Sequence, residues 1–197
     1  MKIVFLRHGD ALNASGGYFG RTDNPLTEVG RKQATARRDA LADYAPDSVW
    51  ISPARRVRET AELALSPVVF ASAVVDSDLR EINFGDWEGK TFREICAEDP
   101  EKVNAWAALS PDFRFPGGES VAEFEERIHR LTARIRSAKD VSRLLVVTHG
   151  GIIRYLLCDL LRLDFSHVWI FSIPPGSLVR LNLADGYAQL EALQDGR

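Results

Sequence analysis

Several features that mark particular protein classes are missing from this chain of 197 residues. Its two cysteines, Cys96 and Cys158, lie far apart, so neither a disulfide framework nor a structural zinc site is expected. The formal net charge of −3 provides no basic field that would attract nucleic acid or anionic lipid. No apolar run approaches the length of a membrane span. These absences predict a globular protein without nucleic-acid or membrane partners.

Targeting and nucleotide-binding motifs are missing as well. No basic segment followed by an apolar core precedes the first apolar run, so no secretion signal is expected. The glycines within residues 9–26 fit neither G-x-G-x-x-G nor a loop that ends in G-K-[ST], and no internal repeat is present. The hydrophobic fraction of 45% suits one sizeable core. The chain is therefore predicted to be a single cytoplasmic domain over residues 1–197.

What the chain does contain is an alternation of apolar runs and helical patterns. Strands are predicted over residues 3–6, 48–51 and 143–148, with two short β-like pieces within 68–75 and a hairpin over 179–193. Helices are predicted from the cap at Thr27 to about residue 44, after Pro53, over 91–106 with a break at Pro100, over 121–135 and over 152–161. This order predicts an α/β fold with a mostly parallel sheet and an antiparallel edge.

Two irregular regions interrupt this alternation. Residues 9–26 form a long loop rich in Gly and Asn directly after the first strand, and loops of this length often carry function. Residues 79–118 interleave large apolar side chains with acids, and the region is too short to own a core. We therefore expect it to be a lid-like insertion over the sheet, able to present a carboxylate to a cleft.

Two of the predicted strands end in the same step, a histidine followed by a glycine. His8-Gly9 follows the first strand, and His149-Gly150 follows the apolar run over 143–148. The carboxyl ends of parallel strands lie at one edge of a sheet, where open α/β folds build their sites. We therefore expect the two imidazoles to lie in one crevice.

Arginines are expected beside the two histidines. Arg7 precedes the first histidine directly, and either Arg55 or Arg56 follows another strand end at a helix N-terminus. Cations are disfavoured at that end of a helix unless they face an anion. Arginine forks match phosphate oxygens and stay charged at any working pH, so the pattern predicts a site for a phosphate dianion.

The same residue types suit phosphoryl transfer without a metal. Guanidinium groups neutralise the phosphate oxygens, a neutral imidazole is a competent nucleophile, and a carboxylic acid can protonate the leaving alkoxide. The candidate acids in the insertion are Glu81, Asp86 and Glu88. A metal hydrolase with His8, Asp10 and His149 as ligands is the alternative, and it predicts activity that a chelator removes.

Six segments in a fixed order resemble the histidine phosphatase superfamily. They are Arg7-His8-Gly9, Pro25-Leu26-Thr27-x-x-Gly30, Ser52-Pro53 with Arg56, Glu81-x-x-x-Gly85-x-x-Glu88-Gly89, Gly117-Gly118-Glu119-Ser120 and Thr148-His149-Gly150-Gly151. The resemblance implies a three-layer α/β/α sandwich and a reaction with no metal or cofactor. It also implies that His8 becomes phosphorylated, with Arg7, Arg56 and His149 forming the phosphate pocket and Glu81 donating the proton. The substrate contacts it suggests are Asn13, Arg21, Thr22 and Gly150.

Within the superfamily the chain looks most like the α-ribazole phosphatases of cobalamin biosynthesis. Residues 84–89, Trp106 and residues 115–120 carry this finer resemblance. Phosphoserine phosphatases and broad-specificity sugar-phosphate phosphatases share much of it, and they are the alternatives. A phosphoglycerate mutase or a phosphate-binding module without activity is less favoured. Asp10 and Ala14 depart from the usual glutamate and asparagine, and these departures concern substrate contacts more than phosphoryl chemistry.

The sequence does not determine the oligomeric state. An apolar stretch near the end of the chain either covers a sheet edge or lines an interface, and the second arrangement would make a homodimer. Its candidate residues are Trp169, Phe171, Pro174 and Pro175. The expected partner in either case is a small phosphate ester.

Overall fold

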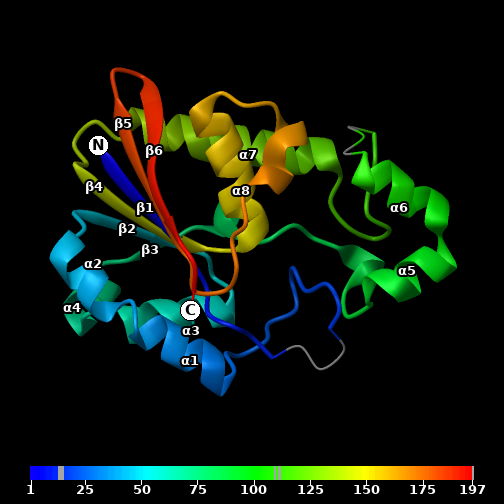
Figure 1. Ribbon diagram of the computed structural model, residues 1–197, viewed down its shortest axis with the longest axis horizontal. Coiled ribbons are helices and arrows are strands. Elements are labelled where there is room, and N and C mark those ends of the chain that lie inside the picture. Colours follow the sequence, from blue (N-terminus) through cyan, green and yellow to red (C-terminus); the bar gives the residue numbers. More distant parts are fainter. Residues whose placement is uncertain (13–15, 109, 111, 197) are drawn as a thin grey trace.

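A computed structural model describes residues 1–12, 16–108, 110 and 112–196 of the chain. It is a sandwich of helices around a six-stranded sheet with the strand order β3-β2-β4-β1-β5-β6. The strands are β1 (Lys2–Arg7), β2 (Ser48–Ile51), β3 (Val74–Val75), β4 (Arg143–Thr148), β5 (Leu178–Ala184) and β6 (Tyr187–Gln194). The first four are parallel, and β5 and β6 form the antiparallel edge (Figure 1). The expected fold class is confirmed.

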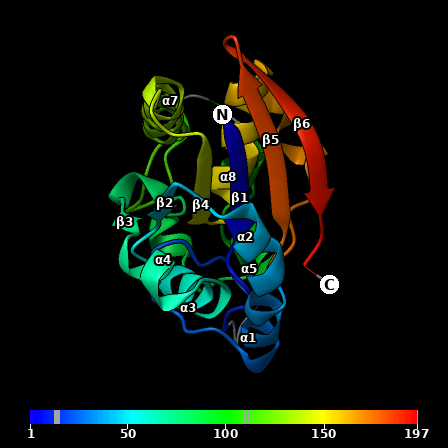
Figure 2. The same cartoon turned by 90° about the vertical axis from the view of Figure 1, so that its left-hand side faces the viewer.

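The central strands are buried on both faces, as their continuous apolar runs predict. On one face, Ile3, Phe5 and Leu144 join a core packed under α7 (Val121–Ser137) and α8 (Gly150–Leu161). On the other face, Val4 and Leu145 pack against residues of the N-terminal helices. Figures 1 and 2 show these two helical layers on either side of the sheet. Side chains alternate between the two faces along each strand, so one hydrophobic core forms on each face of the sheet.

The first helical region differs from its prediction as one continuous helix. Thr27 caps α1 (Glu28–Thr35) by accepting a hydrogen bond from the Gly30 N–H, but the helix ends there and α2 (Arg38–Tyr44) follows. Between them, the guanidinium of Arg37 donates to the carbonyls of Gly176 and Asp195. Through these hydrogen bonds the residue between the two helices contacts the end of the chain. Local periodicity does not reveal such a tertiary contact.

A second correction concerns residues 68–75, where two β-like pieces were expected. The first is helical: Ser66 caps α4 (Pro67–Ala71) and accepts from the Val69 N–H, with Pro67 in the first turn. A Ser-Pro cap outweighs the β preference of the valines that follow. Only the second piece is a strand, β3, which extends the parallel sheet beside β2.

Residues 79–118 extend from one side of the sandwich (Figure 1). They contain the 3-10 turn η2 (Gly85–Trp87), the helix α5 (Phe92–Glu98) and the helix α6 (Pro100–Ala107), with the break at Pro100 as predicted. The segment begins at the end of η1 (Ser77–Leu79). Its inner surface is aromatic: the ring centroids of Trp87 and Phe115 lie 5.3 Å apart. The aromatic side chains fix the position of this region relative to the sheet.

The remaining elements follow their local signals. The capping box at Ser120 and Glu123 begins α7, and the Asp185-Gly186 turn joins β5 and β6. The helix α3 (Arg55–Ala64) follows β2, and the 3-10 segment η3 (Phe165–Ile170) follows α8. None of the helices in the described ranges is both long and apolar enough to cross a membrane.

Candidate active site

The two histidines meet at the carboxyl ends of neighbouring parallel strands. Strands β1 and β4 pair in register as far as Arg7 and Thr148, so His8 and His149 are the next residue on each. The His8 N–H donates to the Thr148 carbonyl over 3.0 Å, which keeps the two chains together past the strand ends. The imidazole centroids lie 5.2 Å apart in an edge-to-face arrangement. The two imidazoles therefore lie side by side as predicted, although His8 lines the cleft described below and His149 is fully buried.

The ring of His8 has a defined orientation. Its Nδ1 lies 2.7 Å from the Gly9 carbonyl oxygen, which can only accept, so Nδ1 carries the proton and Nε2 keeps its lone pair. The Arg56 Nε–H donates to that Nε2 over 3.3 Å. Burial lowers the pKa of His8 well below its usual value, and the charges of Arg7 and Arg56 lower it further. The imidazole is therefore neutral, as a nitrogen nucleophile must be.

Arg7 brings a positive charge that the protein itself leaves partly unpaired. One terminal nitrogen donates to the Ile173 carbonyl, whereas the buried Nε has no hydrogen-bond partner within the described part of the chain. Burial lowers the pKa of Arg7 to about 10, so it remains cationic near neutral pH. A buried guanidinium nitrogen without a partner is costly unless an anion completes it. Arg7 also lies against Gly150, where a Cβ would come within 3.1 Å of its Cζ.

Geometry separates Arg56 from Arg55, which the residue pattern alone left equivalent. Arg56 is buried, and it donates to the Thr22 and Gly20 carbonyls, each over 2.9 Å. Arg55 is exposed and pairs with Glu59 one turn along α3, at 2.7 Å. Arg56 is thus the arginine of α3 that faces the two histidines.

His149 occupies the N-cap position of α8 and is fully buried. Its Nδ1 accepts from the Arg56 guanidinium over 3.1 Å, so the proton sits on Nε2 and points to the Ser52 Oγ at 2.9 Å. Burial lowers the pKa of His149 well below its usual value, and Arg56 and His8 add to the effect. A negatively charged ligand would reverse part of this shift, because the imidazolium gains an opposite charge.

Glu81 is the acid of the insertion that the structure places in the cleft. Its two carboxylate oxygens accept from the Gly151 N–H over 2.9 Å and the Ile82 N–H over 3.1 Å. A Cβ at position 151 would lie 2.4 Å from Glu81 Oε1, so the glycine permits this approach. Glu81 also lies beside the charges of Arg7 and Arg154. The carboxylate is therefore held by backbone donors next to the arginines.

The other two candidate acids have different surroundings. Asp86 is exposed and packs against the Gly117 turn. Glu88 receives four hydrogen bonds from residues 20–22, through the N–H groups of Gly20, Arg21 and Thr22 and the Thr22 hydroxyl. Because Arg56 donates to carbonyls of the same segment, Glu88 holds in place the loop that positions Arg56.

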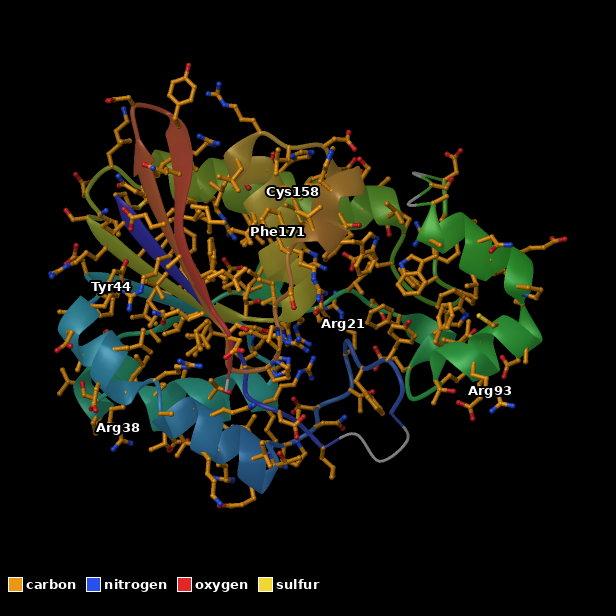
Figure 3. All side chains as sticks on the ribbon, in the orientation of Figure 1. Arg21, Arg38, Tyr44, Arg93, Cys158 and Phe171 are labelled. Carbon is orange, nitrogen blue, oxygen red and sulfur yellow. The ribbon has the colours of Figure 1, made fainter. Side chains whose placement is uncertain are left out.

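The predicted substrate contacts fall into three groups. Gly150 lines the cleft. Arg21 and Thr22 lie beside it without lining it: Thr22 binds Glu88, and Arg21 lies 3.8 Å from the Glu119 carboxylate. Figure 3 shows Arg21 between the sheet and the insertion. Asn13 lies outside the described residues.

The bonds to Glu88 make a pH-dependent prediction. Burial raises the pKa of Glu88, but the hydrogen bonds from Thr22, Arg21 and Gly20 outweigh burial and lower it below its usual value. A lowered pKa in the folded state adds stability at pH 7 that disappears as pH falls through that pKa. Glu88→Gln should reduce the free energy of unfolding at pH 7 by about 1–2 kcal/mol.

Urea unfolding of wild type and Glu88→Gln between pH 7 and pH 3 tests this prediction. The difference between the two should shrink as the solution becomes more acidic, because only the wild type loses an ionised carboxylate. Glu62→Gln, on the exposed side of α3, is the matched control and should behave as wild type. A difference that stays constant with pH would contradict a role for the ionised carboxylate.

The site opens into a cleft of about 390 Å³. Its polar lining residues are Arg7, His8, Asp10, Asn24, Arg56, Glu81 and Arg154, and aromatic side chains form much of the rest. The aromatic lining residues are Tyr18, Phe19, Phe84, Trp106, Phe124, Tyr155 and Trp169. Across the described ranges, no three side chains of His, Cys, Asp and Glu gather as a metal site requires. Asp10, the third ligand of the metal alternative, instead accepts from the Thr27 hydroxyl at 2.7 Å.

Arg154 is a charged residue of this cleft that residue patterns missed. Arg154 lies one turn after Gly151 on α8, so its spacing from the His149-Gly150 step is the signal that could have found it. Trp169 and Pro175, which were expected either at an interface or over a sheet edge, also line the cleft. Phe171 is buried, and its carbonyl accepts from Arg154.

An α/β sandwich with two neutral imidazoles and buried arginines at its strand ends is the architecture of an enzyme that acts on phosphate esters. The chain belongs to branch 1 of the histidine phosphatase superfamily, whose family model matches residues 3–196. The protein is a phosphatase, in agreement with the family and with the names of relatives that match it along nearly the whole chain.

Three relatives illustrate the range of similarity. The adenosylcobalamin/α-ribazole phosphatase of Salmonella typhimurium is 31% identical, over 98% of this chain and 96% of its own. The crystal structure of the α-ribazole phosphatase from Shigella flexneri has a TM-score of 0.90 at 29% identity, covering 100% of this chain and 97% of that chain. Phosphoserine phosphatase 1 of Hydrogenobacter thermophilus is 29% identical, over 87% of this chain and 81% of its own.

Proposed function

We propose that the protein is a metal-independent phosphomonoesterase that works through a phosphohistidine at His8. The Nε2 lone pair attacks phosphorus, the P–N bond forms as the P–O bond to the alcohol breaks, and Glu81 gives its proton to the leaving oxygen. Water then attacks the phosphohistidine, Glu81 takes a proton from it, and phosphate leaves with the His8 nitrogen restored. Arg7, Arg56 and His149 stabilise the charge on the phosphoryl oxygens.

The orientation of His8 is the single observation that carries this mechanism. The Gly9 carbonyl fixes the proton on Nδ1, so the unprotonated Nε2 is the atom next to Arg56. The unpartnered Nε of Arg7 supports an anion at this point. Glu81 lies in the same cleft, and each of its oxygens accepts one backbone N–H, which leaves a second lone pair to carry a proton to the alcohol.

We further propose that the substrate is α-ribazole 5′-phosphate. Two features support this choice: the similarity to α-ribazole phosphatases along nearly the whole chain, and a cleft whose walls beyond the phosphate pocket are aromatic. A benzimidazole riboside offers an apolar ring to such walls, whereas phosphoserine does not. The insertion contributes Glu81, Phe84 and Trp106 to the cleft, and we infer that residues 79–118 act as its lid.

A phosphate-release panel with a chelator present tests the proposed substrate. The compounds are α-ribazole 5′-phosphate, phosphoserine, 3-phosphoglycerate and several sugar phosphates. We expect α-ribazole 5′-phosphate to exceed the others in kcat/KM by at least about 100-fold, as one well-placed ring contact plus orientation allows. A preference for phosphoserine would show that the proposed substrate is wrong, while the proposed mechanism would stand. Activity that returns only with added metal would contradict the mechanism.

A further inference from the structure

One large aromatic side chain of the cleft is far more exposed than the catalytic histidine. Trp169 lines the same cleft as His8, yet 59% of Trp169 is exposed, compared with 7% of His8. It sits on η3, after α8, whereas the loop over residues 9–26 contributes Leu12 and Phe19 from a different part of the chain (Figure 1). Trp169 therefore stands at the mouth of the cleft, and His8 lies at its base.

Five of the six other aromatic side chains of the cleft are already packed against one another. Tyr18 contacts Trp106 with ring centroids 5.3 Å apart, and it contacts Phe84 at 5.2 Å. Phe124 similarly packs edge-to-face on Tyr155 at 4.8 Å. Their rings form a fixed wall. Trp169 and Phe19 belong to no ring pair within the part of the chain that the structure describes, and Trp169 is the exposed one of the two.

Arg154 holds one side of the Trp169 ring. The Arg154 Cζ lies 5.6 Å from the ring centroid, and its Nε–H donates to the Phe171 carbonyl over 3.0 Å. A guanidinium held in this way restricts the motion of the ring and is attracted to its π electrons. Covering this exposed aromatic surface with an apolar part of a ligand would be favourable.

We propose that Trp169 is a specificity residue that stacks on an aromatic ring in the alcohol part of the phosphate ester. The phosphate sits at His8, and the ring of the alcohol lies on Trp169 as the third layer of an Arg154–Trp169–ring stack. Stacking on an aromatic side chain tolerates different heterocycles but requires a flat π surface. The inference rests on the proposed function. It adds the residue that would recognise the aromatic base, the group by which α-ribazole 5′-phosphate differs from a simple sugar phosphate.

The test compares α-ribazole 5′-phosphate with ribose 5-phosphate, which has the same phosphate and a ribose but no base. In the wild type the ratio of their kcat/KM values is expected to be large. Trp169→Ala should reduce that ratio by about 10-fold or more, mainly through a higher KM for the aromatic ester. Trp169→Phe keeps a stacking surface and should recover most of the ratio. Ile170→Ala, an exposed neighbour on η3 outside the cleft lining, should leave the ratio unchanged.

Calorimetric binding of free α-ribazole, which has no phosphate, separates this inference from the proposed function. Binding that is lost in Trp169→Ala supports the stacking site even if turnover favours another ester. A wild-type preference for α-ribazole 5′-phosphate that survives in Trp169→Ala would overturn the inference and leave the function standing. Absence of both the preference and the binding in the wild type would overturn both. A thermal melt checks that each variant is folded.

Discussion

Replacing His8 with alanine should lower kcat by about 10⁴-fold or more, as loss of a covalent nucleophile does in other enzymes. The physical reason is that His149, the neighbouring imidazole, is fully buried and lies outside the cleft lining, so it cannot replace His8 as the nucleophile. The phosphate pocket would remain, so the variant should still bind inorganic phosphate. Phosphate release from 4-nitrophenyl phosphate, with binding measured separately, reports both quantities.

The matched control for this substitution is His129→Ala. His129 lies on α7 with a half-exposed ring, 3.1 Å from the Asp159 carboxylate and outside the cleft lining. Its loss should leave kcat within a factor of two or so, as surface substitutions usually do. If His8→Ala kept a substantial part of the wild-type rate while staying folded, another group would be the nucleophile and the proposed mechanism would be wrong.

Replacing Glu81 with glutamine should produce an effect that depends on the leaving group. Glutamine can still accept from the Gly151 or Ile82 N–H, but it has no proton to give. Alkyl esters leave as strongly basic alkoxides and should slow by about 10²–10⁴-fold in kcat, the usual contribution of a general acid. 4-Nitrophenyl phosphate leaves as a weakly basic phenolate and should slow less than about tenfold.

The comparison of an alkyl and an aryl ester in the same variant serves as its own internal control. Glu62→Gln, an exposed Glu-to-Gln change on α3, should affect neither ester. Equal slowing of both esters by Glu81→Gln would reject Glu81 as the proton donor and would indicate that it only positions Gly151 or the arginines. Glu88 is not a suitable alternative acid, since each of its oxygens accepts two hydrogen bonds from residues 20–22 and it lies outside the cleft lining.

Much of this site could be predicted because its histidines follow strands with strong local signals. The apolar runs before His8 and before His149 identify central parallel strands, and strand order then brings their ends together. The choice of Arg56 over Arg55 came from resemblance and is matched by burial in the structure. The choice of Glu81 over Glu88 also came from the resemblance; in the structure Glu81 lines the cleft and Glu88 binds residues 20–22.

What sequence patterns could not supply depends on contacts between distant segments. The break between α1 and α2 coincides with bonds from Arg37 to a segment about 140–160 residues further along. The Ser66-Pro67 cap gave a helix where valines suggested a strand. The place of Trp169 at the mouth of the cleft follows from how η3 packs on α8, which no local pattern encodes. These are tertiary effects, and they concentrate in loops and at the rim of the site.

The most direct test of the account is to trap the phosphoenzyme. Wild-type protein mixed with substrate in the presence of a chelator is quenched within milliseconds, and the intact mass and peptide map are measured under alkaline conditions that preserve phosphohistidine. The account predicts a single phosphoryl group on His8 that appears before free phosphate accumulates and is absent from His8→Ala. Turnover with no phosphorylated intermediate, or a phosphoryl group on another residue, would contradict it.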